Sequence, residues 1–219
     1  MRRKRRGHGL PGLEPVSREF GFERGKPVDR WYIERFLNEH RADIRGAVLE
    51  VAESTYTQWY GGGDVTTSDV LHRAGNDEST ILGDLTTGEG LPQQAYDCFI
   101  CTQTLPFIYD IHAAVRGMAN ILKPGGVVLA TVPGMSQVSR DDKRDWGDWW
   151  RFTSQGTQRL FEEAFEHVEV EAHGNVLSAA AFLYAYAAEE LTEAELEHRD
   201  PDYELLITVR ATAGISSSP

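Results

Sequence analysis

The sequence predicts an α/β protein in which helices cover both faces of a mostly parallel, doubly wound sheet. Short apolar segments alternate along the 219 residues with segments of helical periodicity, an order typical of parallel sheets. Residues 127–132 (VVLATV) are apolar on both faces, as in a central strand between two helical layers. Sheets of this type bind ligands at the carboxyl ends of their strands.

Seven strands are expected, each a short apolar or alternating run. They cover residues 47–51, 65–68, 79–83, 98–104, 127–132, 167–171 and 204–210. The second strand is expected to end at Asp69 and the third at Asp84. Helices are expected from Asp29 as N-cap to Leu37, before the turn at residues 124–126 (PGG), at 155–165 and at 176–190.

Length and composition fit one domain with a basic start. The chain is 41% hydrophobic and 26% charged, as in soluble globular proteins. We interpret residues 1–25 as a flexible basic arm, 26–212 as the domain and 213–219 as a disordered tail. The net charge is −12 although five basic residues stand at positions 2–6. The remainder is therefore acidic, which argues against nucleic acid as a partner; the arm alone could bind nucleic acid or an anionic membrane.

No segment predicts a membrane span or a secretory signal. The longest apolar segment, 176–188, is too short to cross a bilayer, and no apolar stretch follows the basic start. We therefore expect a cytoplasmic protein with no membrane partner. Cys98 and Cys101 are three positions apart in a predicted strand, so their thiols face opposite sides. We interpret both as core residues rather than as a redox or zinc pair.

One stretch of the chain resembles a known family. Residues 96–134 contain an Asp-opened strand (YDCFICT), a helix ending in ILKPGG and a second strand (VVLATVP). In this order and spacing they resemble the second half of a class I S-adenosylmethionine-dependent methyltransferase domain of type 11. The resemblance implies an enzyme with S-adenosyl-L-methionine as its cofactor. It also implies a Rossmann-like seven-stranded sheet that is mostly parallel, with an antiparallel last strand.

The resemblance places part of the cofactor at the loop after the first strand. Glu50 matches the acidic residue of the family's first motif, but the glycine-rich turn that usually follows is replaced by AEST at 52–55. Ala52 is small enough to permit close approach of a ligand. The methionine carboxylate could bind hydroxyl and backbone N–H groups of Ser54, Thr55 and Thr57. The alternative is that this loop closes a degenerate site.

Further cofactor contacts are implied at the ends of other strands. Asp69 stands where the family places an acidic residue on the ribose hydroxyls, although a helix N-cap is the alternative. Asp84 and Leu85 match the pair that meets the adenine, in a position that an ordinary turn also explains. Thr102 and Gln103, at the end of the fourth strand, match family positions that contact the cofactor.

Residues 134–153 form an insert that is too long and too aromatic for a simple connector. Aromatic rings beside carboxylates suit a sugar ring, a polyol or a cationic amine. The candidate acceptor-binding residues are Tyr109, Trp146, Trp149, Trp150 and Arg151. The alternative is that Trp149 or Trp150 packs against the late helix.

Methyl transfer to a hydroxyl requires alignment of two reactants and a group that removes a proton. His112 at the start of the helix after the fourth strand, His173 at the end of the sixth strand and Asp148 of the insert are the candidates. Either histidine could instead be structural. No His and Asp cluster has metal-ligand spacing, so no metal is expected.

Three functions remain open at this stage. The leading hypothesis is methylation of a small molecule, at the oxygen of a sugar or natural-product hydroxyl. A catalytically degenerate methyltransferase-like protein, acting as a binding or regulatory partner, is the alternative. A nucleotide-dependent oxidoreductase is disfavoured, because the glycine fingerprint for a pyrophosphate and a Tyr-x-x-x-Lys motif are absent. The apolar helix at 176–190 must be covered by the insert or by a second copy, so a monomer and a homodimer are both possible.

Overall fold

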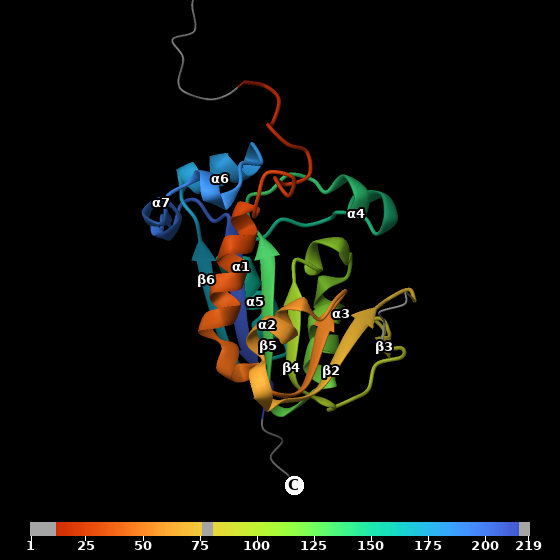
Figure 1. Cartoon of the computed structure of the whole chain (residues 1–219). Coiled ribbons are helices and arrows are strands. Elements are labelled where there is room, and N and C mark those ends of the chain that lie inside the picture. Colours follow the sequence, from red (N-terminus) through yellow and green to blue (C-terminus); the bar gives the residue numbers. More distant parts are fainter. Residues whose placement is uncertain (1–11, 76–80, 215–219) are drawn as a thin grey trace, which may run out of the picture.

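The sheet has seven strands in the order β3-β2-β1-β4-β5-β7-β6 (Figure 1). The protein is represented by a computed structural model that describes residues 12–75 and 81–214. The strands are β1 Gly46–Val51, β2 Val65–His72, β3 Ile81–Leu82, β4 Tyr96–Thr102, β5 Leu122–Pro133, β6 His167–His173 and β7 Leu206–Thr212. Only β7 runs antiparallel to its neighbours β5 and β6. The predicted mostly parallel sheet with an antiparallel last strand is therefore confirmed.

Helices cover both faces of the sheet, as the sequence predicts (Figure 1). The α-helices are α1 Val28–Glu39, α2 Thr55–Tyr60, α3 Ile111–Ile121, α4 Arg140–Asp145, α5 Ser154–Glu162, α6 Val176–Leu183 and α7 Glu193–Glu197. Short 3-10 helices cover Arg41–Asp43, Gly62–Asp64, Leu105–Phe107 and Ala188–Glu190. One apolar core lies between the sheet and α3 and α5, and the other between the sheet and α1 and α6. Cys101 belongs to the first and Cys98 to the second, so the two thiols do face opposite sides.

The helix α1 begins two residues earlier than the sequence suggests. Its N-cap is Pro27, and Asp29 lies inside the first turn, where its residue is only 8% exposed. Proline is well suited to a helix start because it lacks the N–H that a first turn leaves unpaired. The prediction of Asp29 as an N-cap is therefore wrong, and its carboxyl group is available for another role.

The strand β2 is longer than predicted, and this moves Asp69 away from the strand end. It continues to His72, with Leu49 paired to Asp69 and Val51 to Leu71. Asp69 Oδ2 accepts a hydrogen bond from the Tyr96 hydroxyl at 2.9 Å, within the sheet. The prediction that Asp69 ends the second strand is corrected.

The late helix is shorter than predicted. It ends at Leu183, and Ala185 adopts a φ of +59°, a left-handed conformation that stops an α-helix. Ala187 then forms an isolated bridge with Pro27. The predicted single helix over 176–190 is therefore a helix, a turn and the 3-10 helix Ala188–Glu190.

Residues 12–27 pack against this turn and the α6 helix. Val16 N donates to Tyr184 O at 2.9 Å, Arg24 Nε donates to Glu190 Oε2 at 3.0 Å, and the rings of Phe20 and Phe182 lie 6.0 Å apart. In Figure 1 this segment crosses above the sheet between α6 and α4. Residues 12–25 are thus part of the folded domain and not of an arm, whereas residues 1–11 lie outside the described residues.

The chain end and the turn before β5 are also defined by this fold. Ala213 N donates to Gly126 O at 2.9 Å, so the domain extends past residue 212; residues 215–219 of the expected tail lie outside the described part. Pairing jumps from Tyr96–Leu122 to Cys98–Val127, which places the predicted PGG turn inside the span assigned to β5.

Within the described ranges, no helix is long and apolar enough to cross a membrane.

Candidate active site

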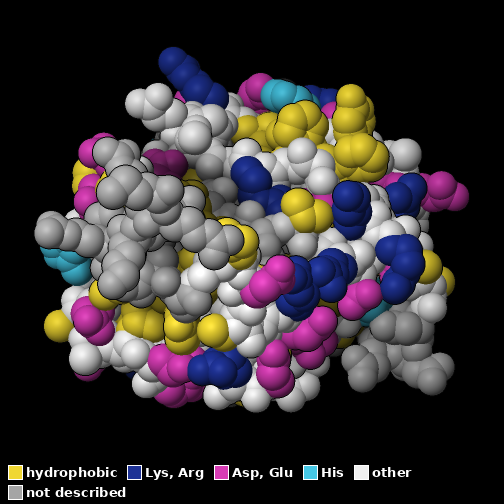
Figure 2. Space-filling view, turned by 90° about the horizontal axis from the view of Figure 1, so that it is seen from above, with side chains coloured by type: hydrophobic (Ala, Val, Ile, Leu, Met, Phe, Trp, Pro, Cys, Tyr) yellow, Lys and Arg dark blue, Asp and Glu magenta, His cyan; other side chains and the backbone are white. Residues whose placement is uncertain are grey.

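A cavity of about 1120 Å³ lies at the carboxyl ends of β1, β4 and β5, on the face seen from above in Figure 2. Val51, Thr102 and Pro133 mark these three strand ends in its lining. Further walls come from residues 20–34, from the loops after β1, β2, β3 and β4, from the insert after β5 and from Phe182 of α6. Figure 2 shows apolar, acidic and basic side chains together on this face. The cavity therefore stands where parallel sheets bind their ligands.

Glu50 organises the loop after β1. Its Oε1 accepts from Tyr56 N at 3.1 Å, and its Oε2 accepts from Thr57 N at 2.8 Å and from Thr57 Oγ1 at 2.7 Å. Burial raises the pKa of the Glu50 carboxyl, and the hydrogen bonds from Thr57 and Tyr56 oppose that rise. The amides of Tyr56 and Thr57 in the first turn of α2 are therefore already occupied, and that of Thr57 was one of those expected to bind a ligand carboxylate.

The same loop keeps part of its predicted role. Ala52 has a φ of +72°, a conformation typical of glycine, and both Ala52 and Thr55 line the cavity. Ser54 is not part of the lining; its hydroxyl accepts from Gln58 Nε2 at 2.8 Å. Thr57 is buried against Glu50. Of the hydroxyls predicted to bind the methionine carboxylate, only that of Thr55 belongs to a cavity-lining residue.

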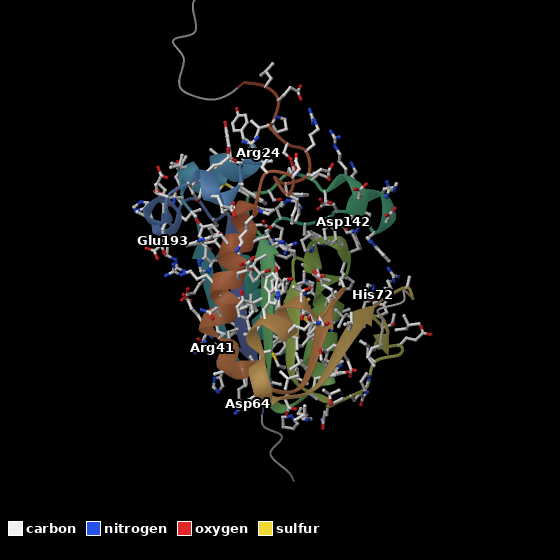
Figure 3. The ribbon with its side chains drawn as sticks, in the orientation of Figure 1. Arg24, Arg41, Asp64, His72, Asp142 and Glu193 are labelled. Atoms are coloured by element: carbon white, nitrogen blue, oxygen red, sulfur yellow. The ribbon has the colours of Figure 1, made fainter. Side chains whose placement is uncertain are left out.

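His72 and Arg73 stand at the end of β2, where the sequence suggested Asp69. His72 Nε2 lies 2.6 Å from Ala52 O, and Arg73 Nε lies 3.2 Å from Asp84 Oδ2. Figure 3 shows His72 at the tip of β2, across the sheet from α1. Both residues line the cavity and Asp69 does not. The apolar pair Val70-Leu71 was the signal in the sequence that the strand continues past Asp69.

The predicted residues after β3 and β4 do line the cavity. Asp84 Oδ1 accepts from Thr86 N at 2.7 Å and from Thr86 Oγ1 at 2.6 Å. Partial burial acts to raise the pKa of Asp84, but the Thr86 bonds and Arg73 hold it below its usual value. Leu85 is buried beside it. Thr102 and Gln103 also line the cavity, and Gln103 has a φ of +51°.

Arg151 and Asp148 tie the insert together. Nη1 and Nη2 of Arg151 bond Asp148 Oδ1 at 2.6 Å and Oδ2 at 3.0 Å, and other guanidinium donors reach the carbonyls of residues 136, 137 and 150. Asp148 also accepts from Ser139 N at 2.9 Å. Although burial opposes it, the bonds from Arg151 lower the pKa of Asp148. These contacts show that Asp148 holds the insert. Asp148 also lines the cavity, and its catalytic role stays a prediction.

The aromatic residues of the insert divide between two roles. Trp146 and Trp149 line the cavity and are 46% and 53% exposed. Tyr109 also lines it, with its ring 5.3 Å from that of Trp149. Trp150 is not in the lining; its indole N–H donates to Ile108 O at 3.1 Å. The prediction that Trp150 contacts an acceptor is corrected.

Neither predicted histidine base lies at the cavity. His112 Nδ1 is 2.8 Å from Glu163 Oε2, on the side of α3 that faces α5. His173 lies between Thr208 Oγ1 at 2.9 Å and Arg199 Nη2 at 3.2 Å; burial and Arg199 lower its pKa to about 4. Both are absent from the lining, so both predictions are corrected. In the described part of the chain, no cluster of three His, Cys, Asp or Glu could hold a metal ion.

Two cavity residues were missed as functional candidates by sequence reasoning. Asp29 and Arg30 stand in the first turn of α1 and both line the cavity. Asp29 Oδ1 is buried without a hydrogen-bond partner, and burial raises the pKa of this carboxyl. Arg30 Nη1 lies 3.5 Å from the Tyr56 hydroxyl, and Arg30 forms no ion pair within the described residues. Adjacent opposite charges at a helix start were the signal available in the sequence.

Comparisons with known proteins agree with this geometry. Residues 43–130 match the family model of a methyltransferase domain (Methyltransf_11). A putative sarcosine dimethylglycine methyltransferase from Galdieria sulphuraria has 13% identity and a TM-score of 0.57, covering 86% of this chain and 90% of that one. The N-methyltransferase NodS from Bradyrhizobium japonicum, solved with S-adenosyl-L-homocysteine, has 14% identity and a TM-score of 0.54, covering 93% and 94%. No curated protein matches the sequence.

The chain therefore has the Rossmann-like fold of class I S-adenosylmethionine-dependent methyltransferases, and its residues 43–130 are similar in sequence to a methyltransferase domain. Methyltransferases of this class use S-adenosyl-L-methionine as their cofactor.

The cavity residues fit this cofactor. Ala52 presents only a methyl group where its backbone borders the cavity. Asp29, whose Oδ1 has no hydrogen-bond partner, and Arg30, which attracts Asp29 electrostatically, carry charges complementary to the ammonium and carboxylate groups of the cofactor. Pockets that hold one drug-sized ligand have volumes of about 300–1000 Å³. At about 1120 Å³, this cavity lies just above that range.

Proposed function

We propose that this enzyme transfers a methyl group to a hydroxyl oxygen of a small molecule that carries a sugar-like or natural-product ring. The observation that carries the proposal is the shared cavity. One side is formed by the strand ends that the family uses for its cofactor, and the other by Trp146, Trp149 and Asp142 of the insert. Aromatic faces next to a carboxylate suit a ring that bears hydroxyl groups.

The residues of the cavity can align the two reactants and accept a proton. When bound, the cofactor supplies a methyl group on a positively charged sulfur, and the acceptor atom displaces that sulfur. We assign proton removal to Asp142, because its carboxylate lines the cavity, forms no ion pair with the other described residues and accepts from Ser139 Oγ at 2.6 Å. In Figure 3 Asp142 stands on α4, above the sheet.

For cofactor contacts, we propose the residues that line the cavity at successive strand ends. Ala52 and Thr55 border the methionine end, Asp84 and Leu85 the adenine, and His72 replaces Asp69 at the ribose. Thr102 and Gln103 complete this wall. The support for these assignments is their position in the lining and their match to family positions.

An amine acceptor is the second candidate. The same aromatic and acidic groups attract a cation, and an amine that has lost its proton is a competent nucleophile. Matched pairs of compounds that differ only in hydroxyl or amino group separate the candidates. The measurement is release of S-adenosylhomocysteine from S-adenosyl-L-methionine. Turnover of the amino member alone contradicts oxygen as the acceptor atom.

The decisive test of the proposal is cofactor binding itself. Calorimetry with S-adenosyl-L-methionine and S-adenosylhomocysteine is expected to show saturable binding of both. Absence of binding at millimolar concentration contradicts the proposal and favours a degenerate protein that acts as a binding or regulatory partner.

We further propose a cytoplasmic monomer or homodimer without nucleic-acid or membrane partners, on the acidic net charge of the chain.

A further inference from the structure

One part of the cavity wall consists of four apolar residues that come from distant parts of the chain. They are Phe20, Pro133 at the end of β5, Phe182 of α6 and Leu205, which precedes β7. The rings of Phe20 and Phe182 lie 6.0 Å apart, and Leu205 O accepts from the backbone N–H that follows Pro133 at 2.9 Å. Phe182 and Leu205 belong to the same apolar core, and Phe20 packs against it. We call these four residues the apolar wall.

The apolar wall offers few free hydrogen-bonding groups to a ligand. All its members except Phe20 have carbonyl oxygens that accept a backbone N–H, at 2.9 to 3.0 Å. Ser136 and Gln137, the polar lining residues that follow β5, are engaged as well. The Ser136 hydroxyl donates to Gln137 O at 3.0 Å, and the Gln137 amide donates to Arg18 O at 3.3 Å. A ligand therefore gains affinity here mainly by removing its apolar surface from water.

The backbone holds the Phe20 ring in this wall through an uncommon conformation. Phe20 has a φ of +56°, in the left-handed region that favours glycine and is unusual for a bulky side chain. The next residue, Gly21, packs so closely on the turn after α6 that an added Cβ would lie 2.8 Å from Ala185 O. Such a conformation persists only where the surrounding contacts determine it, and it is typical of residues that shape a site.

The apolar wall adjoins the insert that the proposed function assigns to the acceptor. The bond from Gln137 to Arg18 O joins the insert to the segment that carries Phe20. In Figure 1 this segment crosses above the sheet between α6 and α4. All four residues of the wall lie outside 43–130, the stretch that is similar to the methyltransferase family. The wall is therefore built by parts of the chain that the family model does not cover, and such parts give one fold different ligands.

We propose that the apolar wall binds a hydrocarbon substituent of the acceptor, so that the substrate of this cavity is amphiphilic. Its hydroxyl-bearing part lies near Trp146 and Trp149, and its apolar arm lies against Phe20 and Phe182. The inference rests on the proposed function, because it names the substrate class of the same cavity. The wall supplies affinity and selectivity, and the methyl transfer itself needs nothing from it.

The test is a series of 1-alkanols with four to eight carbon atoms. Each carries one hydroxyl group and one hydrocarbon arm, so the result does not depend on the ring of the natural acceptor. The series is titrated into ¹⁵N-labelled protein, with and without saturating S-adenosylhomocysteine. Backbone amide chemical shifts report both the affinity and the place of binding.

Four proteins are compared in this series. They are the wild type, Phe20→Asn, Phe20→Leu and the control Leu13→Ala, which removes an apolar side chain that is 96% exposed and outside the cavity lining. Thermal unfolding checks that each variant is folded. Calorimetry gives the affinity of each for S-adenosylhomocysteine.

Affinity of the wild type is expected to rise about fourfold with each added methylene group until the arm fills the space at the wall. The amide shifts of Phe182 and Leu205 should follow this rise. Phe20→Asn should flatten the dependence on chain length, Phe20→Leu should keep most of it, and Leu13→Ala should match the wild type. Affinity for S-adenosylhomocysteine should be the same in all four proteins.

Three results overturn the inference. The first is a wild type whose affinity does not depend on chain length, or whose shifts lie away from Phe182 and Leu205. The second is a full dependence on chain length in Phe20→Asn, which limits Phe20 to anchoring its segment on α6. The third is weaker binding of S-adenosylhomocysteine in both Phe20 variants, which places the wall at the cofactor.

The same measurements separate this inference from the proposed function. A wild type that binds no S-adenosylhomocysteine overturns the proposed function. Binding of 1-alkanols that still depends on chain length and on Phe20 then supports the apolar wall as a binding site by itself.

Discussion

Arg151 and Asp148 form a two-point ion pair, at 2.6 and 3.0 Å, that fixes the insert beside the cavity. The Asp148 side chain is 2% exposed and that of Arg151 is 28% exposed. The same guanidinium donates to Gln137 O at 2.5 Å and to Ser136 O at 3.3 Å, on the strand-proximal side of the insert. The pair therefore closes a loop of some fifteen residues that carries Trp146 and Trp149.

Arg151→Ala is expected to loosen this loop, because it leaves a buried carboxylate without its cation. The cost is about 3 kcal/mol, at the lower end for a buried pair because Arg151 is partly exposed. Acceptor KM should rise while affinity for S-adenosylhomocysteine stays the same. The matched control is Arg144→Ala, which removes exposed pairs with Asp141 and Asp145 and should cost about 0–1 kcal/mol. An unchanged acceptor KM in Arg151→Ala shows that the insert does not shape the acceptor site.

Glu50→Gln is expected to weaken the loop after β1. The new amide group turns one acceptor into a donor opposite the N–H groups of Tyr56 and Thr57, and one buried donor is left without a partner. We expect a loss of about 1–3 kcal/mol in the free energy of unfolding, with reduced S-adenosylhomocysteine affinity. Chemical denaturation and calorimetry measure the two effects. Normal affinity in a destabilised variant limits Glu50 to a structural role.

Cofactor binding is expected to release a proton from Asp29. Burial raises the pKa of this carboxyl in the free protein, whereas a bound ammonium favours the charged form and lowers the pKa. Between the two pKa values the free protein holds the proton and the complex does not, so binding strengthens as pH rises through this window. Calorimetry of S-adenosylhomocysteine binding in buffers of different ionisation enthalpy measures the release. Release that persists unchanged in Asp29→Asn comes from another group.

Asp69→Ala is expected to change stability and leave cofactor binding intact. Asp69 accepts the Tyr96 hydroxyl inside the sheet, and its loss leaves that partly buried group unpaired. We expect a loss of about 1–2 kcal/mol in the free energy of unfolding and unchanged S-adenosylhomocysteine affinity. A large fall in S-adenosylhomocysteine affinity with an unchanged free energy of unfolding contradicts this prediction and supports a contact between Asp69 and the ribose.

The strands of the sheet could be predicted because each is a short run whose apolar residues serve two packed faces. The boundaries were harder, since local pattern does not fix where pairing stops. Asp69 follows the polar residues Thr66 to Ser68 and suggests a strand end, but Val51 pairs with Leu71, and β2 continues to His72. Ala185 belongs to an alanine-rich segment with high helix propensity, yet the bridge between Pro27 and Ala187 lies just beyond it.

The candidate site was only partly predictable for the same reason. Residues at strand ends, such as Asp84 and Gln103, follow from the order of elements along the chain. The side chains that reach the cavity from α1 depend on how that helix packs over the sheet. Asp29 has the residue type of an N-cap, and the two-residue shift of the cap to Pro27 moves it into the first turn. His112 and His173 were plausible by residue type, but their helix and strand direct them to Glu163 and Thr208.

The contacts of residues 12–27 have a consequence for how the protein is made. Arg24 and Glu190 are 166 positions apart, and the backbone N–H of Val16 donates to the carbonyl of Tyr184, which is synthesised much later. During synthesis the first part of the cavity wall therefore has no partner until nearly the whole chain has left the ribosome. Long-range contacts of this kind form late because a large loop must close first. We expect nascent chains that end before residue 184 to hold an assembled parallel half-sheet whose ligand edge is still open.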